Sequence, residues 1–77
     1  MIDFNLFATR LKSLRLIHKL TLQQLGEAID STKATIGNLE NCNKQPSLLM
    51  VVALADYFDV SLDYLVGRTD NPDSHKR

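Results

Sequence analysis

Residues 20–40 read LTLQQLGEAIDSTKATIGNLE and contain two short helical patterns separated by a break. Thr21 and Gln24 have the spacing of a capping box, which predicts that the first helix begins at Leu22. Three apolar residues form the expected buried face of this helix: Leu25, Ala28 and Ile29.

The second pattern follows the break IDST and predicts a helix over residues 33–40. Ser31 or Thr32 can cap it, and Ile36 and Leu39 lie on its buried side. Helices of about eight residues are unstable alone in water, so the two must pack on each other and on further elements. Two short helices joined by a tight turn form a helix-turn-helix unit.

Two residues of this stretch fit such a unit. Gly26 falls where the helices are expected to cross, and a residue without a side chain permits close approach there. Asp30 falls where the chain reverses, and aspartate tolerates a left-handed backbone better than most residues.

Helical patterns also lie on both sides of this unit. Before it, a helix capped by Asp3 or Asn5 is predicted from apolar residues at spacings of three and four: Phe4, Phe7, Leu11, Leu14 and Ile17. After it, a helix beginning at Ser47 has the stripe Leu48, Val51, Ala55 and Phe58. A last helix, capped by Ser61, turns Leu62 and Leu65 inward and ends before Gly67. The sequence therefore predicts an all-α, compact five-helix bundle over residues 1–68, with a flexible polar tail over 69–77.

Composition narrows the class of protein. The 77 residues suffice for one small domain, and the single cysteine, Cys42, suits a reducing cytoplasm. Neither a signal peptide nor an apolar stretch long enough to span a membrane is recognisable. His18 and His75 have no partners at metal-ligand spacing, and no catalytic constellation is recognisable. The sequence therefore implies no enzyme, no metal and no cofactor.

The net charge is zero, which argues mildly against a strongly electrostatic nucleic-acid binder. The charges are unevenly spread, however. Residues 1–45 carry six basic and four acidic side chains, whereas residues 46–77 carry three basic and five acidic ones. A locally basic face is compatible with this distribution.

Two longer stretches resemble a known family. LTLQQLGEAIDSTKATIGNLENCNKQPS (20–47) and LADYFDVSLDYLVGRTDNP (54–72) resemble the phage-repressor-like helix-turn-helix regulators, the lambda, P22 and 434 repressor and Cro relatives often called the XRE family. The resemblance covers about residues 4–67. It implies a compact five-helix domain whose third helix enters the major groove of DNA.

The resemblance also implies site residues. Base-reading candidates are Thr32, Lys33, Ala34, Thr35, Gly37 and Asn38. Phosphate-contact candidates are Arg10, Thr21, Gln23, Asn41, Asn43 and Lys44. The alternative for each of these residues is an ordinary solvated surface.

Family members pair an arginine of the first helix with the glutamate that ends the third, and Arg15 and Glu40 occupy those positions. Three positions depart from the family pattern. Leu22 stands where glutamine usually begins the second helix, Cys42 where glycine usually follows the third, and Asn38 where arginine is frequent. These departures and the neutral charge predict modest affinity per monomer.

A second apolar line on the helix after Ser47 is a candidate homodimer interface. Together with two residues of the last helix, the candidates are Leu49, Ala53, Tyr57, Tyr64 and Val66. The alternative is that this helix is buried over a wide arc.

The sequence is thus interpreted as a sequence-specific, DNA-binding transcriptional regulator of the cytoplasm. We expect a homodimeric repressor of a prophage or mobile element, bound to a near-palindromic operator, with no membrane and no small-molecule ligand. A restriction–modification controller protein is an alternative of the same fold, and an antitoxin is less favoured because the tail is short. The rival from another class is a protein-interaction module that has lost DNA binding.

Overall fold

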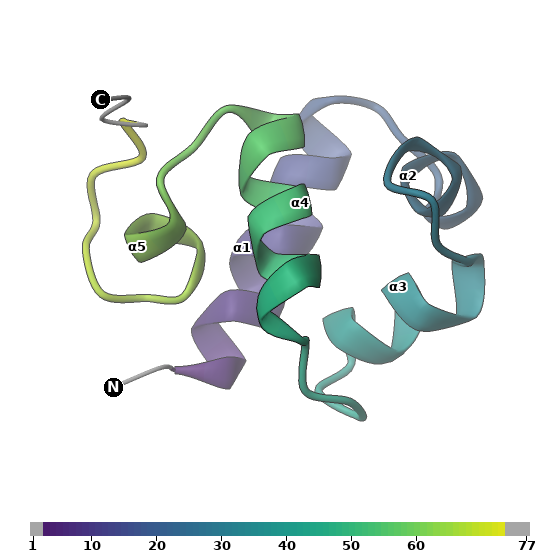
Figure 1. The fold of residues 1–77 in the computed structure, drawn as a ribbon, viewed down its shortest axis with the longest axis horizontal. Coiled ribbons are helices and arrows are strands. Elements are labelled where there is room, and N and C mark those ends of the chain that lie inside the picture. The colour runs from purple at the N-terminus through teal and green to yellow at the C-terminus, as the bar shows by residue number, and fades with distance from the viewer. Residues whose placement is uncertain (1–2, 74–77) are drawn as a thin grey trace.

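The structure, a computed structural model, describes residues 3–73 and contains five α-helices within them (Figure 1). They are α1 (Phe4–Ile17), α2 (Leu22–Ala28), α3 (Lys33–Glu40), α4 (Leu48–Phe58) and α5 (Leu62–Leu65). No strand occurs in residues 3–73. The predicted all-α, five-helix fold is confirmed.

Every helix begins with a side chain that accepts a hydrogen bond from a backbone N–H of its first turn. These N-caps are Asp3, Thr21, Thr32, Ser47 and Ser61. Thr21 and Gln24 form the predicted capping box, with bonds of 2.9 and 3.0 Å in the two directions. Short polar side chains therefore fix the helix starts that the sequence predicted.

A residue with positive φ stands at the end of each helix. These residues are Lys19, Asp30, Cys42, Asp59 and Gly67. After α3, Cys42 N–H donates to Leu39 O at 3.3 Å and Asn43 N–H to Asn38 O at 2.9 Å. This is the Schellman pattern, which satisfies the last carbonyls of a helix. Cys42 therefore adopts the left-handed turn that glycine would adopt with less strain.

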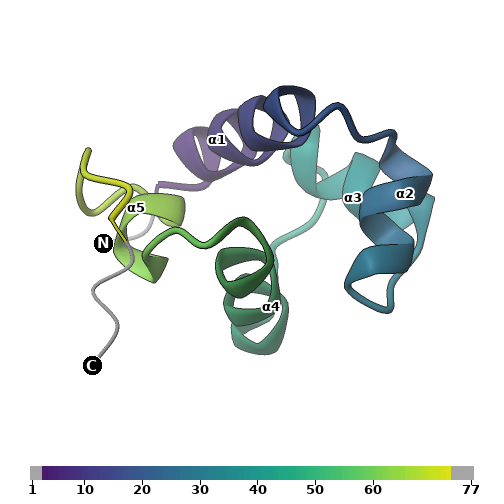
Figure 2. The same cartoon turned by 90° about the horizontal axis from the view of Figure 1, so that it is seen from above.

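The helices enclose one core, with α2 and α3 at one end of the molecule and α5 at the other (Figures 1 and 2). The centre is filled by side chains without solvent exposure. They include Leu11 of α1, Leu25 of α2, Ile36 of α3, Leu54 of α4 and Leu65 of α5. Each helix thus contributes a leucine or isoleucine to the same cluster. No helix in residues 3–73 is both long and apolar enough to cross a membrane.

Several predicted core positions are wrong. Leu48 is 74% exposed, whereas Leu54, which the predicted stripe omitted, is 0% exposed. The rest of the predicted stripe on α4 is buried: Val51, Ala55 and Phe58. Because α4 is apolar on nearly every side, periodicity alone could not show that Leu54 rather than Leu48 completes this buried face. Ile17, Ala28 and Leu62 are also exposed rather than buried.

Residues 69–73, expected to belong to a flexible tail, contact the helical body. Arg10 of α1 donates to the Thr69 carbonyl at 2.6 Å, and the Ser61 N–H donates to the Pro72 carbonyl at 3.1 Å. The domain therefore extends beyond the expected boundary at residue 68. The rest of the expected tail, residues 74–77, lies outside the described residues.

Candidate nucleic-acid interface

The α2–α3 unit is held together where Gly26 meets the start of α3. A β-carbon on Gly26 would lie 2.7 Å from the carbonyl carbon of Thr32 and 2.9 Å from its oxygen. The chain then reverses through Asp30, whose φ is 60°, and Ser31 N–H donates to Gly26 O at 2.6 Å. Glycine is therefore required at the crossing, as predicted.

The side of α3 that faces away from the core is polar but carries little charge. Lys33, Ala34 and Asn38 are exposed, whereas Ile36 and Leu39 are buried. Thr35 is half-buried; its N–H donates to the Thr32 hydroxyl oxygen at 3.1 Å, and its own hydroxyl oxygen accepts from the Thr32 hydroxyl at 3.0 Å. The Thr32 hydroxyl therefore caps α3 and also bonds to the hydroxyl of Thr35, so the hydroxyl groups of both base-reading candidates have partners within the domain.

Gly37 lies against α2. A β-carbon on Gly37 would have one close neighbour beyond its own helix, Leu22 Cδ1 at 3.8 Å. Leu22 is half-buried and packs against the core. The side chain of Leu22, which departs from the family pattern, therefore lies over the position where α3 lacks a side chain.

Arg15 and Glu40, the two residues expected to pair, are in contact. Arg15 Nε lies 2.6 Å from Glu40 Oε2 and Nη2 lies 3.1 Å from Oε1, while Nη1 donates to Leu20 O at 2.8 Å. The side chains are only 11% and 6% exposed. The hydrogen bond to Glu40 raises the pKa of Arg15, despite the opposing effect of burial. This bidentate pair joins the end of α3 to α1.

The loop after α3 contains three of the phosphate-contact candidates. Asn41, Asn43 and Lys44 are all exposed. The loop is held to the start of α1 by the Cys42 thiol, which lies 3.3 Å from Asn5 Oδ1. A positively charged side chain and two amides therefore lie beside the C-terminal end of α3.

The two phosphate-contact candidates at the start of α2 form hydrogen bonds within this helix. Thr21 caps it, and Gln23 Nε2 donates to Glu27 Oε2 at 3.2 Å. Both residues are exposed. A hydroxyl and an amide are thus present at this edge of the α2–α3 unit.

Arg10, also a phosphate-contact candidate, requires correction. Its guanidinium lies 4.1 Å from the centre of the Tyr64 ring and donates to Tyr64 O, to Thr69 O and, at 2.8 Å, to Asp70 Oδ1. Only 11% of the side chain is exposed. Because its donors are used to hold α5 and residues 69–70, Arg10 is a structural residue.

The expected dimer-interface residues divide into two groups. Leu49 and Tyr57 are exposed and Ala53 is half-buried, so this line of α4 remains at the surface. Val66, by contrast, is 5% exposed and belongs to the core, and Tyr64 is half-buried beneath Arg10. The expectation that Val66 offers an exposed apolar side chain is therefore wrong.

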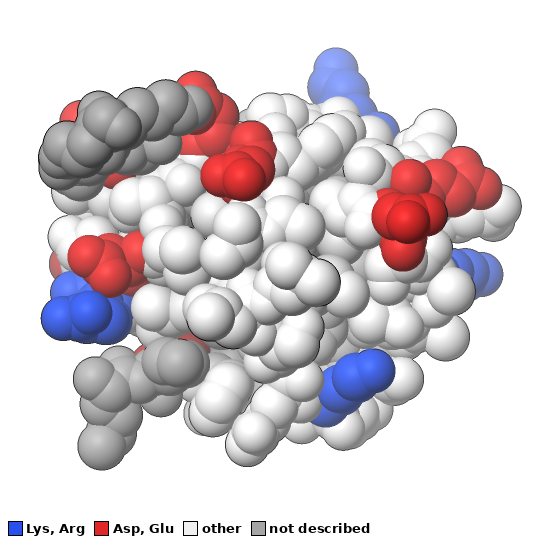
Figure 3. All heavy atoms as spheres, in the orientation of Figure 1, with Lys and Arg blue, Asp and Glu red and all other residues white. Residues whose placement is uncertain are grey.

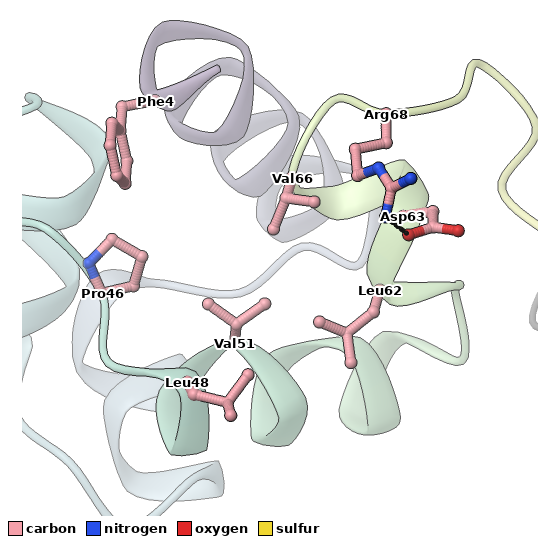
Figure 4. Close-up of a pocket in the computed structure, with 8 residues that line it drawn as sticks. All are labelled: Phe4, Pro46, Leu48, Val51, Leu62, Asp63, Val66 and Arg68. Carbon is pink, nitrogen blue, oxygen red and sulfur yellow. Dashed lines mark hydrogen bonds and ion pairs between the residues drawn. The ribbon is translucent and has the colours of Figure 1, made fainter. Parts of the chain in front are cut away.

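Beside this line lies an apolar pocket of about 320 Å³ between the starts of α1 and α4 and the last helix, α5 (Figure 4). It is lined by Phe4, Pro46, Leu48, Val51, Leu62, Asp63, Val66 and Arg68. Charged side chains lie around the rim of the face that α4 presents, and the centre of this face carries none (Figure 3). The centre of this face is therefore uncharged, and Leu48, Leu49 and Tyr57 of α4 are exposed apolar side chains.

Three comparisons with known proteins agree with this geometry. A family model described as helix-turn-helix matches residues 11–65. Among solved structures, the chain resembles the P22 c2 repressor protein in complex with synthetic operator 9T, with a TM-score of 0.78 and 23% sequence identity. That match covers 83% of this chain and 97% of the repressor chain, and it shows a common fold.

Among curated proteins, the chain is similar to YobD of Bacillus subtilis (strain 168), described as an uncharacterized HTH-type transcriptional regulator. The two are 46% identical over 68 residues, which is 88% of this chain and 61% of YobD. The chain therefore spans less than two thirds of the length of this relative.

Proposed function

This chain belongs to the helix-turn-helix family of the XRE type, and from that premise we propose that it represses transcription by binding a near-palindromic DNA operator as a homodimer. The observation that carries the proposal is the exposed, weakly charged face of α3 on a rigid support. Gly26 fixes how α3 crosses α2, and the Arg15–Glu40 pair fixes α3 to α1. A helix that must enter a major groove needs such a fixed position.

In this proposal the side chains of α3 and of the following loop have separate tasks. Asn38 is exposed on α3 and is proposed to read a base edge, because an amide can bond bidentately to adenine. Lys33 and Lys44 supply positive charge, since Arg10 and Arg15 are used inside the domain. With so few free cations near α3, we expect weak binding by a monomer and dependence on a second copy.

The homodimer is proposed to form through the exposed apolar surface of α4. Leu48 and Leu49 are 74% and 81% exposed, and together with Tyr57 they replace the buried Val66 as the interface. The longest extent of the domain is 30 Å. Two copies placed side by side can therefore present their α3 helices to half-sites about 34 Å apart, one turn of DNA.

Substituting Asn38 and Lys44 separately should distinguish base reading from phosphate contact. We expect Asn38→Ala to change which operator sequence binds best, because it removes an amide from the proposed reading face. We expect Lys44→Ala to weaken binding to all sequences alike and to reduce the slope of log K against log salt by about 0.9. Selection from a random duplex library and titrations at several salt concentrations measure both effects.

The protein-interaction module remains the competing function. It would show no salt-dependent affinity for any duplex, and that outcome would reject the proposal. If Asn38→Ala lost the same affinity for every DNA sequence, the chain would still be a DNA-binding protein, but Asn38 would not be one of its base-reading residues.

A charge introduced at Leu49 should prevent dimerisation. Leu49→Glu would place a carboxylate in the apolar surface of α4, where association would have to desolvate it. Sedimentation at micromolar concentration should show dimers of the original protein and monomers of the variant. Ile17→Glu is the matched control, because Ile17 is 72% exposed and belongs to another helix, α1. If the original protein bound its DNA as a monomer, the proposed homodimer would be contradicted.

A further inference from the structure

The apolar pocket beside α4 is formed by segments that lie far apart in the sequence. Phe4 begins α1, Pro46 precedes α4, and Leu62 begins α5. The volume of the pocket, about 320 Å³, lies in the range of small-molecule sites, about 300–1,000 Å³. The sequence alone implied no small-molecule ligand, because no single stretch of it contains this site. The folded chain nevertheless forms a concave site of suitable size.

The pocket combines buried and exposed apolar side chains. Val51 and Val66 are buried, whereas Phe4, Leu48 and Leu62 are exposed. All five line the pocket. An apolar occupant would remove the exposed side chains from water, and this burial favours binding. The body of a ligand for this pocket should therefore be apolar.

Charged side chains lie at one end of the pocket only. Figure 4 shows Asp63 and Arg68 at one edge, and Phe4 and Pro46 at the opposite edge. The backbone keeps the two charged residues together, because Arg68 N–H donates to Asp63 O at 2.7 Å. The polarity of the pocket thus matches a ligand with an apolar chain and one charged group at its end.

The ion pair at this end favours a carboxylate as the charged group. Arg68 Nη1 lies 3.5 Å from Asp63 Oδ1, and both side chains are mainly exposed. The contact uses one of the five N–H donors of the guanidinium, whereas a well-placed carboxylate accepts two parallel N–H bonds from it. Because exposed ion pairs contribute little to stability, a ligand carboxylate can replace Asp63 beside Arg68 at little cost.

We infer that this pocket binds a small molecule with an apolar chain and one carboxylate, and that its binding opposes dimerisation. The chain would lie against Val51 and Val66, and the carboxylate would bond to Arg68. Leu48 lines the pocket and also belongs to the proposed homodimer interface. A Leu48 side chain that covers a ligand is no longer available to a second copy, so the two binding events compete. This second part of the inference rests on the proposed function.

Octanoate is a suitable probe, with octanol and octylamine as probes that have the same chain and a different end group. Calorimetric titration of the original chain without DNA should show that octanoate binds about 10-fold more tightly than either, because only the carboxylate gains charge-assisted bonds to Arg68. Chemical shifts of the Val51 and Val66 methyl groups should change when octanoate is added. These shifts would locate the ligand in the pocket.

Two substitutions at the charged end should have opposite effects. Arg68→Gln should remove the advantage of octanoate over octanol. Asp63→Asn should increase the affinity for octanoate, because it removes a like charge and the competing partner of Arg68. Lys12→Gln is the matched control: it removes an exposed positive charge from α1 outside the pocket and should leave the advantage intact. All three side chains are exposed, so the fold should be retained.

Sedimentation tests the competition with dimerisation. Saturating octanoate should reduce the fraction of dimers of the original chain. Equal affinities for octanoate and octanol, an unchanged advantage of octanoate in Arg68→Gln, or a dimer fraction that bound octanoate does not change would each overturn the inference. A chain that binds octanoate but is monomeric both with and without it, on DNA as in solution, would instead overturn the proposed homodimer and leave the ligand site in place.

Discussion

Replacing Arg15 by alanine is expected to lower the free energy of unfolding by about 3–5 kcal/mol. The change would leave the Glu40 carboxylate, which is 6% exposed, without its bidentate partner in a poorly solvated site. It would also remove the donor that bonds to Leu20 O. Because small domains are stable by only about 5–15 kcal/mol, a large share of the stability would be lost. Urea unfolding followed by circular dichroism measures the change.

Arg68→Ala is the matched control for this ion pair. Arg68 and Asp63 lie 3.5 Å apart, but both side chains are about 60% exposed. Surface ion pairs contribute about 0–1 kcal/mol, so little change in unfolding is expected. If Arg15→Ala cost no more than Arg68→Ala, the Arg15–Glu40 pair would not be what fastens α3 to α1.

Replacing Leu54 by alanine is expected to cost about 2–5 kcal/mol, because it opens a cavity at the centre of the domain. Leu54 is 0% exposed, whereas Leu48 on the same helix is 74% exposed. Leu48→Ala should therefore change the free energy of unfolding by less than about 0.5 kcal/mol. Both variants remove the same atoms from α4, so the difference between them measures burial directly. The unfolding measurements should be made at low protein concentration, so that association between copies does not contribute to the free energy of unfolding.

The opposite order of these two effects would mean that α4 is rotated from the orientation in the structure. Leu48 would then belong to the core, as the stripe in the sequence predicted. The comparison thus tests the two positions of α4, Leu48 and Leu54, at which the predicted stripe and the structure disagree.

The helix boundaries could be predicted from the sequence because they depend on local chemistry. Thr21 with Gln24, Thr32, Ser47 and Ser61 are short polar side chains that cap the helices they precede. Gly26 and Asp30 likewise predicted a close crossing and a left-handed turn. Each of these features depends on residues within a few positions of one another.

The site was only partly predictable, because its geometry depends on residues far apart in the chain. Arg10 has the positive charge that a phosphate contact needs, but its guanidinium packs on the Tyr64 ring and bonds to Asp70. Sequence spacing cannot show whether such a cation is available at the surface or bonded inside the domain.

The sequence by itself determined where each helix begins and ends, since capping and turn formation are local interactions. Only the tertiary structure decided that Leu54 rather than Leu48 is buried on α4, and where the guanidinium of Arg10 lies. It also decided that Leu22 covers Gly37. The physical reason is that burial and long-range hydrogen bonds arise when distant segments pack together, and an apolar or charged residue is compatible with several such arrangements.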